Sequence, residues 1–128
     1  MSYILDTSVA IPLRDGDDVI RAKLRALSGV ISLSAITRVE LDGGVHVNAR
    51  NATIRQRRLD KLLAGTPTLD FGKAEAVAYG QIVAQIGYSR RKVIDRMIAA
   101  QAIVIGATLV TLNPDDFSDI PDLNLLAL

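Results

Sequence analysis

The chain has 128 residues, a formal net charge of +1 and no cysteine, which predicts one domain over residues 1–128 and excludes disulfides and thiolate metal sites. The net charge by itself neither indicates nor excludes nucleic acid as a partner. No apolar stretch reaches the roughly 18 residues that span a bilayer, and the first residues lack a basic segment followed by an apolar one. We therefore expect a cytoplasmic protein that does not enter a membrane.

Short apolar segments recur along the chain and are separated by polar or glycine-containing turns. They predict strands over residues 3–5, 30–33, 108–112 and 123–126. Segments with apolar residues at helical spacing predict helices over residues 8–13 (interrupted near Pro12), 17–27, 52–63, 74–86 and 93–105. One more helix is expected after Ser34, which is a good N-cap.

Gly43 and Gly44 fall in the helix that follows Ser34, where glycine is unfavourable. They either permit close packing or end that helix early. Short apolar strands separated by helices favour parallel pairing. The predicted fold class is therefore α/β, a three-layer α/β/α sandwich with a mostly parallel central sheet.

Acidic residues stand in apolar surroundings at three places, where an ionised carboxylate is costly unless a positive charge meets it. Asp6 follows the first predicted strand, and Glu40 and Asp95 lie within predicted helices. Asp116 follows the strand over residues 108–112. The carboxyl ends of parallel strands share one edge of a sheet, and ligands collect there. Oxygen ligands without cysteine suit Mg²⁺ or Mn²⁺, so the sequence predicts a metal site for chemistry on phosphates.

Each of these acids also has an ordinary structural interpretation. Asp6 would cap the helix that follows it. Asp95 would form an ion pair with Arg91, four residues earlier, or with a partner elsewhere in the chain. Asp116 would lie in the first turn of a short helix.

Basic residues are concentrated in two segments, and each segment is either a phosphate-contacting patch or a solvated helix face. The first contains Arg50, Arg55, Arg57, Arg58 and Lys61, and the second contains Arg90, Arg91, Lys92 and Arg96.

Four segments in order along the chain resemble the motifs of PIN-domain ribonucleases, specifically the VapC-type toxins of bacterial and archaeal toxin–antitoxin pairs. They are Ile4-Leu5-Asp6-Thr7-Ser8, Ser34-Ala35-Ile36-Thr37-Arg38-Val39-Glu40-Leu41, Asp95-Arg96-Met97-Ile98-Ala99-Ala100-Gln101-Ala102 and Gly106-Ala107-Thr108-Leu109-Val110-Thr111-Leu112-Asn113. Phe117, followed by Ile120-Pro121-Asp122-Leu123, matches the usual ending of the family. The resemblance covers nearly the whole chain.

The resemblance implies a PIN-like α/β/α fold, usually homodimeric, in which acidic residues hold Mg²⁺ or Mn²⁺. Carried over by position, the catalytic residues are Asp6, Glu40, Asp95 and Asp116. Asp6 and Asp95 are the implied metal ligands, and Glu40 supports the metal or its waters. Asn113 competes with Asp116 for the fourth place; we assign the acid to Asp116 and a neighbouring polar role to Asn113.

Thr7, Arg96 and Asn113 are the candidate substrate-binding residues. Arg96 stands where many relatives have a small residue, and it either reaches a phosphate or tempers the charge of the pocket.

The function that the resemblance implies is that of a Mg²⁺-dependent endoribonuclease, the toxin of a toxin–antitoxin module. RNA is then the substrate and a VapB-type antitoxin the partner. One alternative is a non-catalytic PIN-like module that binds RNA or a partner without cutting. The other is a structure-specific DNA nuclease, because the same acids would serve it.

Overall fold

A five-stranded sheet in the order β3-β2-β1-β4-β5 forms the centre of the molecule, and every neighbouring pair of strands is parallel. The computed structural model describes residues 1–128, with strands β1 (Ser2–Leu5), β2 (Val30–Ser34), β3 (Thr68–Leu69), β4 (Thr108–Thr111) and β5 (Asn124–Ala127). The four predicted strands are confirmed to within one residue at each end. Strand β3 was not predicted, because two residues are too few to show an alternating pattern.

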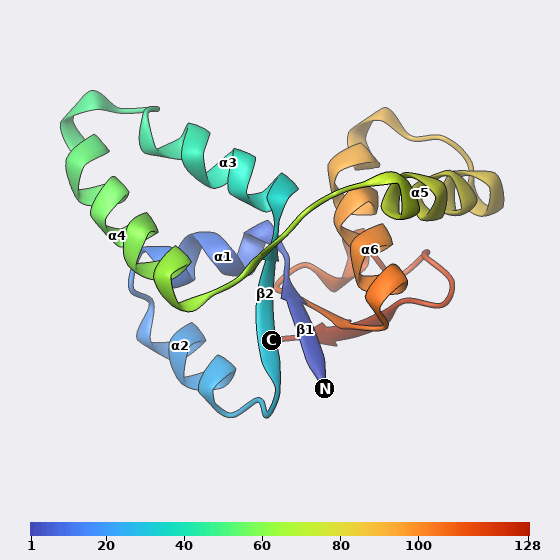
Figure 1. Cartoon of the computed structure of the whole chain (residues 1–128), viewed down its shortest axis with the longest axis horizontal. Coiled ribbons are helices and arrows are strands. Elements are labelled where there is room, and N and C mark those ends of the chain that lie inside the picture. Colours follow the sequence, from blue (N-terminus) through green and yellow to red (C-terminus); the bar gives the residue numbers. More distant parts are fainter.

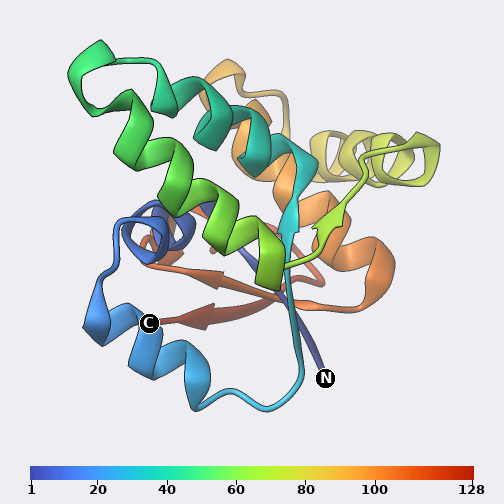
Figure 2. The same ribbon diagram turned by 60° about the vertical axis from the view of Figure 1, so that its left-hand side comes forward.

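Six α-helices cover the sheet: α1 (Thr7–Arg14), α2 (Asp18–Arg25), α3 (Ala35–Val45), α4 (Ala52–Gly65), α5 (Lys73–Ile86) and α6 (Val93–Ile105). Helices α1 to α4 lie on one side of the sheet and α5 and α6 on the other, as Figures 1 and 2 show. Three short 3-10 turns connect the elements: η1 (Ala49–Asn51), η2 (Arg90–Lys92) and η3 (Pro114–Asp116). The predicted three-layer sandwich is confirmed, with a sheet that is wholly parallel. None of the helices is both long enough and apolar enough to pass through a bilayer.

The hydrophobic core is divided in two by the sheet. Tyr3 and Leu5 of β1 belong to the cluster on the side of α1, α2 and α4, whereas Ile4 belongs to the cluster on the side of α5 and α6. Strand β4 divides in the same way, with Val110 on the first side and Leu109 on the second. Successive side chains of a strand point to opposite faces, so a strand covered on both faces is apolar at consecutive positions in its middle.

The predicted interruption near Pro12 is wrong. Helix α1 contains Pro12 and continues to Arg14. Proline lacks an N–H group, so one hydrogen bond to the preceding turn is missing. The hydrogen bonds that follow in the helix do form; for example, Asp15 N donates to Ile11 O at 3.0 Å.

Helix α3 begins where it was predicted to begin, since Ser34 Oγ accepts a hydrogen bond from Ile36 N at 2.9 Å. The helix passes through both glycines and ends at Val45, so they do not end it early. Close packing does not require them either. A Cβ atom at Gly43 would meet nothing within 4 Å, and one at Gly44 would lie 3.6 Å from Arg14 Nη1, an ordinary contact.

We expect Gly43→Ala to raise the free energy of unfolding by about 1 kcal/mol, because alanine loses less conformational entropy in a helix than glycine and the added methyl group meets open space. Urea unfolding followed by circular dichroism measures the change. The control is Gly106→Ala, which should lower stability because Gly106 ends α6 at a φ of 66°. Equal effects of the two substitutions would contradict the explanation.

Candidate active site

The four predicted acids all lie near the carboxyl edge of the sheet. Asp6 directly follows β1, and Glu40 lies in α3, which begins where β2 ends. Asp95 is in the first turn of α6, and Asp116 is the last residue of η3, which follows β4. The charges of Asp6, Asp116 and Glu40 all act on the Asp95 carboxyl group. Parallel topology therefore gathers residues that are far apart in the sequence.

Asp6 is nearly buried, with 4% of its surface exposed, and its carboxylate is held by two hydroxyl groups. Ser8 Oγ donates to Asp6 Oδ2 at 2.7 Å, and Thr111 Oγ1 donates to the same oxygen at 2.9 Å. Asp6 occupies the N-cap position of α1, but its side chain accepts no capping hydrogen bond. The capping interpretation is therefore wrong. Both hydroxyl groups bind Oδ2 and leave Oδ1 without a hydrogen bond from the chain.

The two hydroxyl groups are oriented by the backbone that follows β4. Leu112 N donates to Ser8 Oγ at 3.1 Å, and Asn113 N donates to Thr111 Oγ1 at 2.9 Å. Each hydroxyl group thus accepts from a backbone N–H and directs its own hydrogen to Asp6. Sequence reasoning missed Thr111, because only the pairing of β1 with β4 brings it beside Asp6.

Glu40 is linked to the start of α1 through Thr7. Thr7 Oγ1 donates to Glu40 Oε1 at 2.7 Å and lies 3.1 Å from Thr37 Oγ1. Thr37 is fully buried one turn before the exposed Glu40. The contact joins the start of α1 to α3 and orients the carboxylate of Glu40. In this structure the Thr7 hydroxyl group therefore orients an acid of the site.

Asp95 carries the clearest electrostatic sign of an active site. Its pKa is raised from 3.8 to about 6, chiefly because burial disfavours the charged form, and further because Asp6, Asp116 and Glu40 are negative. Lys92 acts in the opposite direction and lowers the pKa. Asp95 forms none of the ion pairs in the structure, so neither an ion pair with Arg91 nor one with a partner elsewhere is present. Carboxylates with shifted pKa values in one place are typical of functional sites.

The acids share a neighbourhood but do not form a finished metal site. No group of three or more acidic or histidine side chains is arranged closely enough to hold a metal ion. The chemistry of the donors nevertheless fits a hard divalent cation, because all of them are carboxylate oxygens. The raised pKa of Asp95 also reports a repulsion that a bound cation would relieve.

Arg96 has a different place from the one predicted. It is only 3% exposed, and its Nη1 donates to Gly87 O at 2.7 Å. Its Nη2 lies 3.6 Å from Asp119 Oδ2, an oxygen that also lies 3.6 Å from Lys92 Nζ. The guanidinium group therefore ties α6 to the loop after α5 and to the segment after η3. Its burial and its contacts within the chain argue against a phosphate contact. The cation that lowers the pKa of Asp95 is Lys92 and not Arg96.

Asn113 and Asp116, the two candidates for the fourth place, differ in how they relate to the other acids. The Asp116 charge raises the pKa of Asp95, which brings Asp116 into the same electrostatic group. Asn113 is exposed, and its contact with the site is made by its backbone N–H group. The electrostatics thus favour Asp116 as the fourth acid.

Comparison with known proteins gives consistent results along the whole chain. The family model of the PIN domain matches residues 3–123. Ribonuclease VapC1 of Rickettsia felis is 35% identical, over 100% of this chain and 97% of the relative.

Two solved structures are similar in fold as well as in sequence. The crystal structure of VapBC2 from Rickettsia felis, bound to a DNA fragment from its promoter, has a TM-score of 0.87 and 29% identity, covering 100% of this chain and 99% of the other. The crystal structure of FitAcB from Neisseria gonorrhoeae has a TM-score of 0.77 and 30% identity, covering 97% and 96%.

The raised pKa of Asp95 makes stability depend on pH. The folded chain binds the proton more tightly than the unfolded chain, so the contribution of this carboxyl group is full below about pH 4 and is lost as the pH rises through about 6. We expect Asp95→Asn to gain stability relative to the wild type over that interval, as measured by urea unfolding at several pH values. Carboxyl-carbon NMR should give a midpoint of about 6 for Asp95. A difference between the two proteins that does not change with pH would contradict this account.

We expect Arg96→Met to lower the free energy of unfolding by about 2 to 3 kcal/mol, because it removes a charge-assisted hydrogen bond to Gly87 O together with the ion pair to Asp119. Arg90→Met, at an exposed position, is the control and should change stability by less than about 0.5 kcal/mol. Urea unfolding of both variants tests the difference. A small effect at Arg96 would show that its contacts do not hold the loops.

Proposed function

Since the chain belongs to the PIN-domain family, we propose that it is a Mg²⁺-dependent endoribonuclease, the toxin component of a toxin–antitoxin module. The resemblance found in the four sequence motifs is confirmed by the family model over residues 3–123 and by relatives named Ribonuclease VapC. The observation that carries the proposal is the raised pKa of Asp95, which three other carboxylates help to produce. Such mutual repulsion is expected where acidic side chains are kept together to bind a cation.

The proposed roles of the residues follow from their contacts. Asp6, whose Oδ1 accepts no hydrogen bond from the chain, and Asp95 are the metal ligands. Glu40, oriented by Thr7, supports the metal or its waters, and Asp116 completes the acidic group. A divalent cation bound there would polarise the phosphate and lower the pKa of a bound water. Mn²⁺ has similar ligand preferences and is an alternative to Mg²⁺.

The substrate and partners in this proposal are RNA and a VapB-type antitoxin. Solved relatives are VapBC complexes, and the chain is similar to the VapBC2 structure over its whole length. We also propose that the protein forms a homodimer and acts in the cytoplasm. Of the candidate substrate contacts, Thr7 and Asn113 remain in the proposal, because both are near the acids.

Cleavage of RNA should stop when either the metal or a ligand is removed. We expect chelation of divalent ions, Asp6→Asn and Asp95→Asn each to lower the cleavage rate at least about 100-fold, because the metal would lose its ligands. Asp42→Asn is the matched control, since this exposed acid of α3 pairs with Arg38 outside the acidic group. The rate is measured on labelled tRNA, rRNA and single-stranded DNA, with Mg²⁺ and with chelator.

The other outcomes of that measurement separate the alternatives. Cleavage that is unaffected by both the chelator and Asp95→Asn would contradict the proposal. Tight binding of RNA without cleavage would favour the non-catalytic module, and faster cleavage of DNA would favour the DNA nuclease. Asp116→Asn compared with its exposed neighbour Asp115→Asn tests the fourth acid, because only Asp116 acts on Asp95. Equal losses in these two variants would remove Asp116 from the site.

A further inference from the structure

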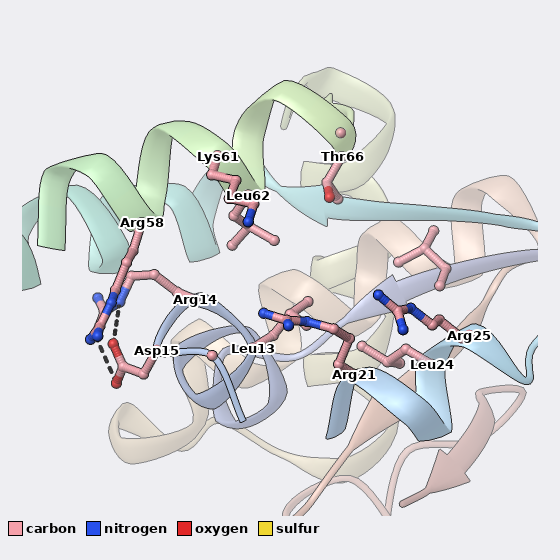
Figure 3. Close-up of a pocket in the computed structure, with 13 residues that line it drawn as sticks. Leu13, Arg14, Asp15, Arg21, Leu24, Arg25, Arg58, Lys61, Leu62 and Thr66 are labelled. Atoms are coloured by element: carbon pink, nitrogen blue, oxygen red, sulfur yellow. Dashed lines mark hydrogen bonds and ion pairs between the residues drawn. The ribbon is translucent and has the colours of Figure 1, made fainter. Parts of the chain in front are cut away.

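A cavity of about 770 Å³ lies between the C-terminal end of α1, helix α2 and helix α4. Its size is within the range of ligand pockets, about 300 to 1,000 Å³. Most of its charged lining is basic: Arg14, Arg21, Arg25, Arg58 and Lys61 face a single acid, Asp15. Figure 3 shows Arg21 and Arg25 on α2, opposite the helix that carries Arg58 and Lys61. The cavity is thus a concentration of positive charge in a chain whose net charge is only +1.

Three of these cations have no acidic partner. Arg14 Nε binds Asp15 Oδ1 at 3.0 Å, and Arg21 Nη1 lies 3.6 Å from the exposed Asp18. Arg25, Arg58 and Lys61 form none of the ion pairs in the structure. Cations that converge on one cavity repel one another, and an anion between them relieves that repulsion.

The cations form two facing rows. Arg21 and Arg25 are four residues apart and therefore lie on one face of α2, and Arg58 and Lys61 are three apart on one face of α4. Positive charges on both sides of a cavity suit a ligand that carries several negative charges. The guanidinium group of arginine also matches phosphate oxygens in a two-point geometry.

We infer that this cavity binds backbone phosphates of the RNA strand whose scissile bond lies at the acidic edge of the sheet. The inference rests on the proposed function. Helix α1 connects the two places, because Asp6 is its N-cap and Arg14 its last residue. Eight helical residues span about 12 Å, so a strand of a few nucleotides is long enough to reach both. No aromatic side chain lines the cavity, so it contacts the backbone rather than stacking bases.

The test compares two double variants that remove equal charge. Arg25→Gln with Lys61→Gln changes the cavity, and Lys23→Gln with Lys73→Gln changes exposed residues outside it. Arg14 stays unchanged because it is buried. Fluorescence anisotropy with a labelled single-stranded RNA, in chelator and at several salt concentrations, gives the affinity and its salt dependence.

We expect the cavity variant to bind RNA about tenfold more weakly at 0.1 M salt and to show a salt slope that is shallower by about 1.4, which corresponds to two lost phosphate contacts on a single strand. The control variant should bind like the wild type. Equal behaviour of the two variants would overturn the inference. Chelator prevents metal-dependent cleavage, so this result is independent of whether the chain cuts RNA.

Two competitors distinguish other ligands of the same charge. Adenosine monophosphate tests whether the cavity takes a small phosphate compound, and an oligoglutamate peptide tests an acidic protein segment. Loss of nucleotide binding in the cavity variant with unchanged RNA binding would overturn the inference. A peptide that binds as tightly as RNA and is equally weakened by the substitutions would overturn it as well.

Discussion

The parallel sheet brings several carboxylates to one edge, where they repel one another. The rest of this structure depends on that constraint. Strands β1 and β4 are neighbours, so the acid after β1 lies beside the hydroxyl group that ends β4. A nearly buried carboxylate is costly, and the hydroxyl groups of Ser8 and Thr111 offset part of that cost at Asp6. The Asp95 carboxylate accepts no hydrogen bond in the structure, and its pKa is raised chiefly by burial and further by the charges of Asp6, Asp116 and Glu40.

The elements around the acids hold them together without neutralising them. Thr7 links the start of α1 to Glu40, and Arg96 links α6 to the loops on either side. Neither contact places a positive charge among the carboxylates, and Lys92 compensates only in part. The group of carboxylates therefore lowers the stability of the folded chain, and a bound cation would restore it. Such an electrostatic cost is common at functional sites.

The cations and the acids are separated in space although the net charge is nearly zero. Arginines from α1, α2 and α4 converge on one cavity, and the carboxylates converge on the other end of α1. A separation of this kind attracts a polyanion to the basic cavity while the edge of the sheet that carries the carboxylates stays acidic. The basic segment around Arg58 and Lys61 thus lines a cavity, while Arg96 of the second segment is part of the interior.

The sequence by itself determined the four longer strands and the six helices, because local periodicity and flanking residues carry that information. The four acids were named from the motifs that resemble the family, and their roles remain a proposal. The sequence left open what depends on distant pairs. Strand β3 exists through its pairing with β2, Thr111 reaches Asp6 through the pairing of β1 with β4, and Arg96 finds partners only in the folded chain. The cavity likewise needs α2 and α4 to face each other. Tertiary structure decided these points, because a side chain's partners are set by the packing of whole elements and not by its neighbours in sequence.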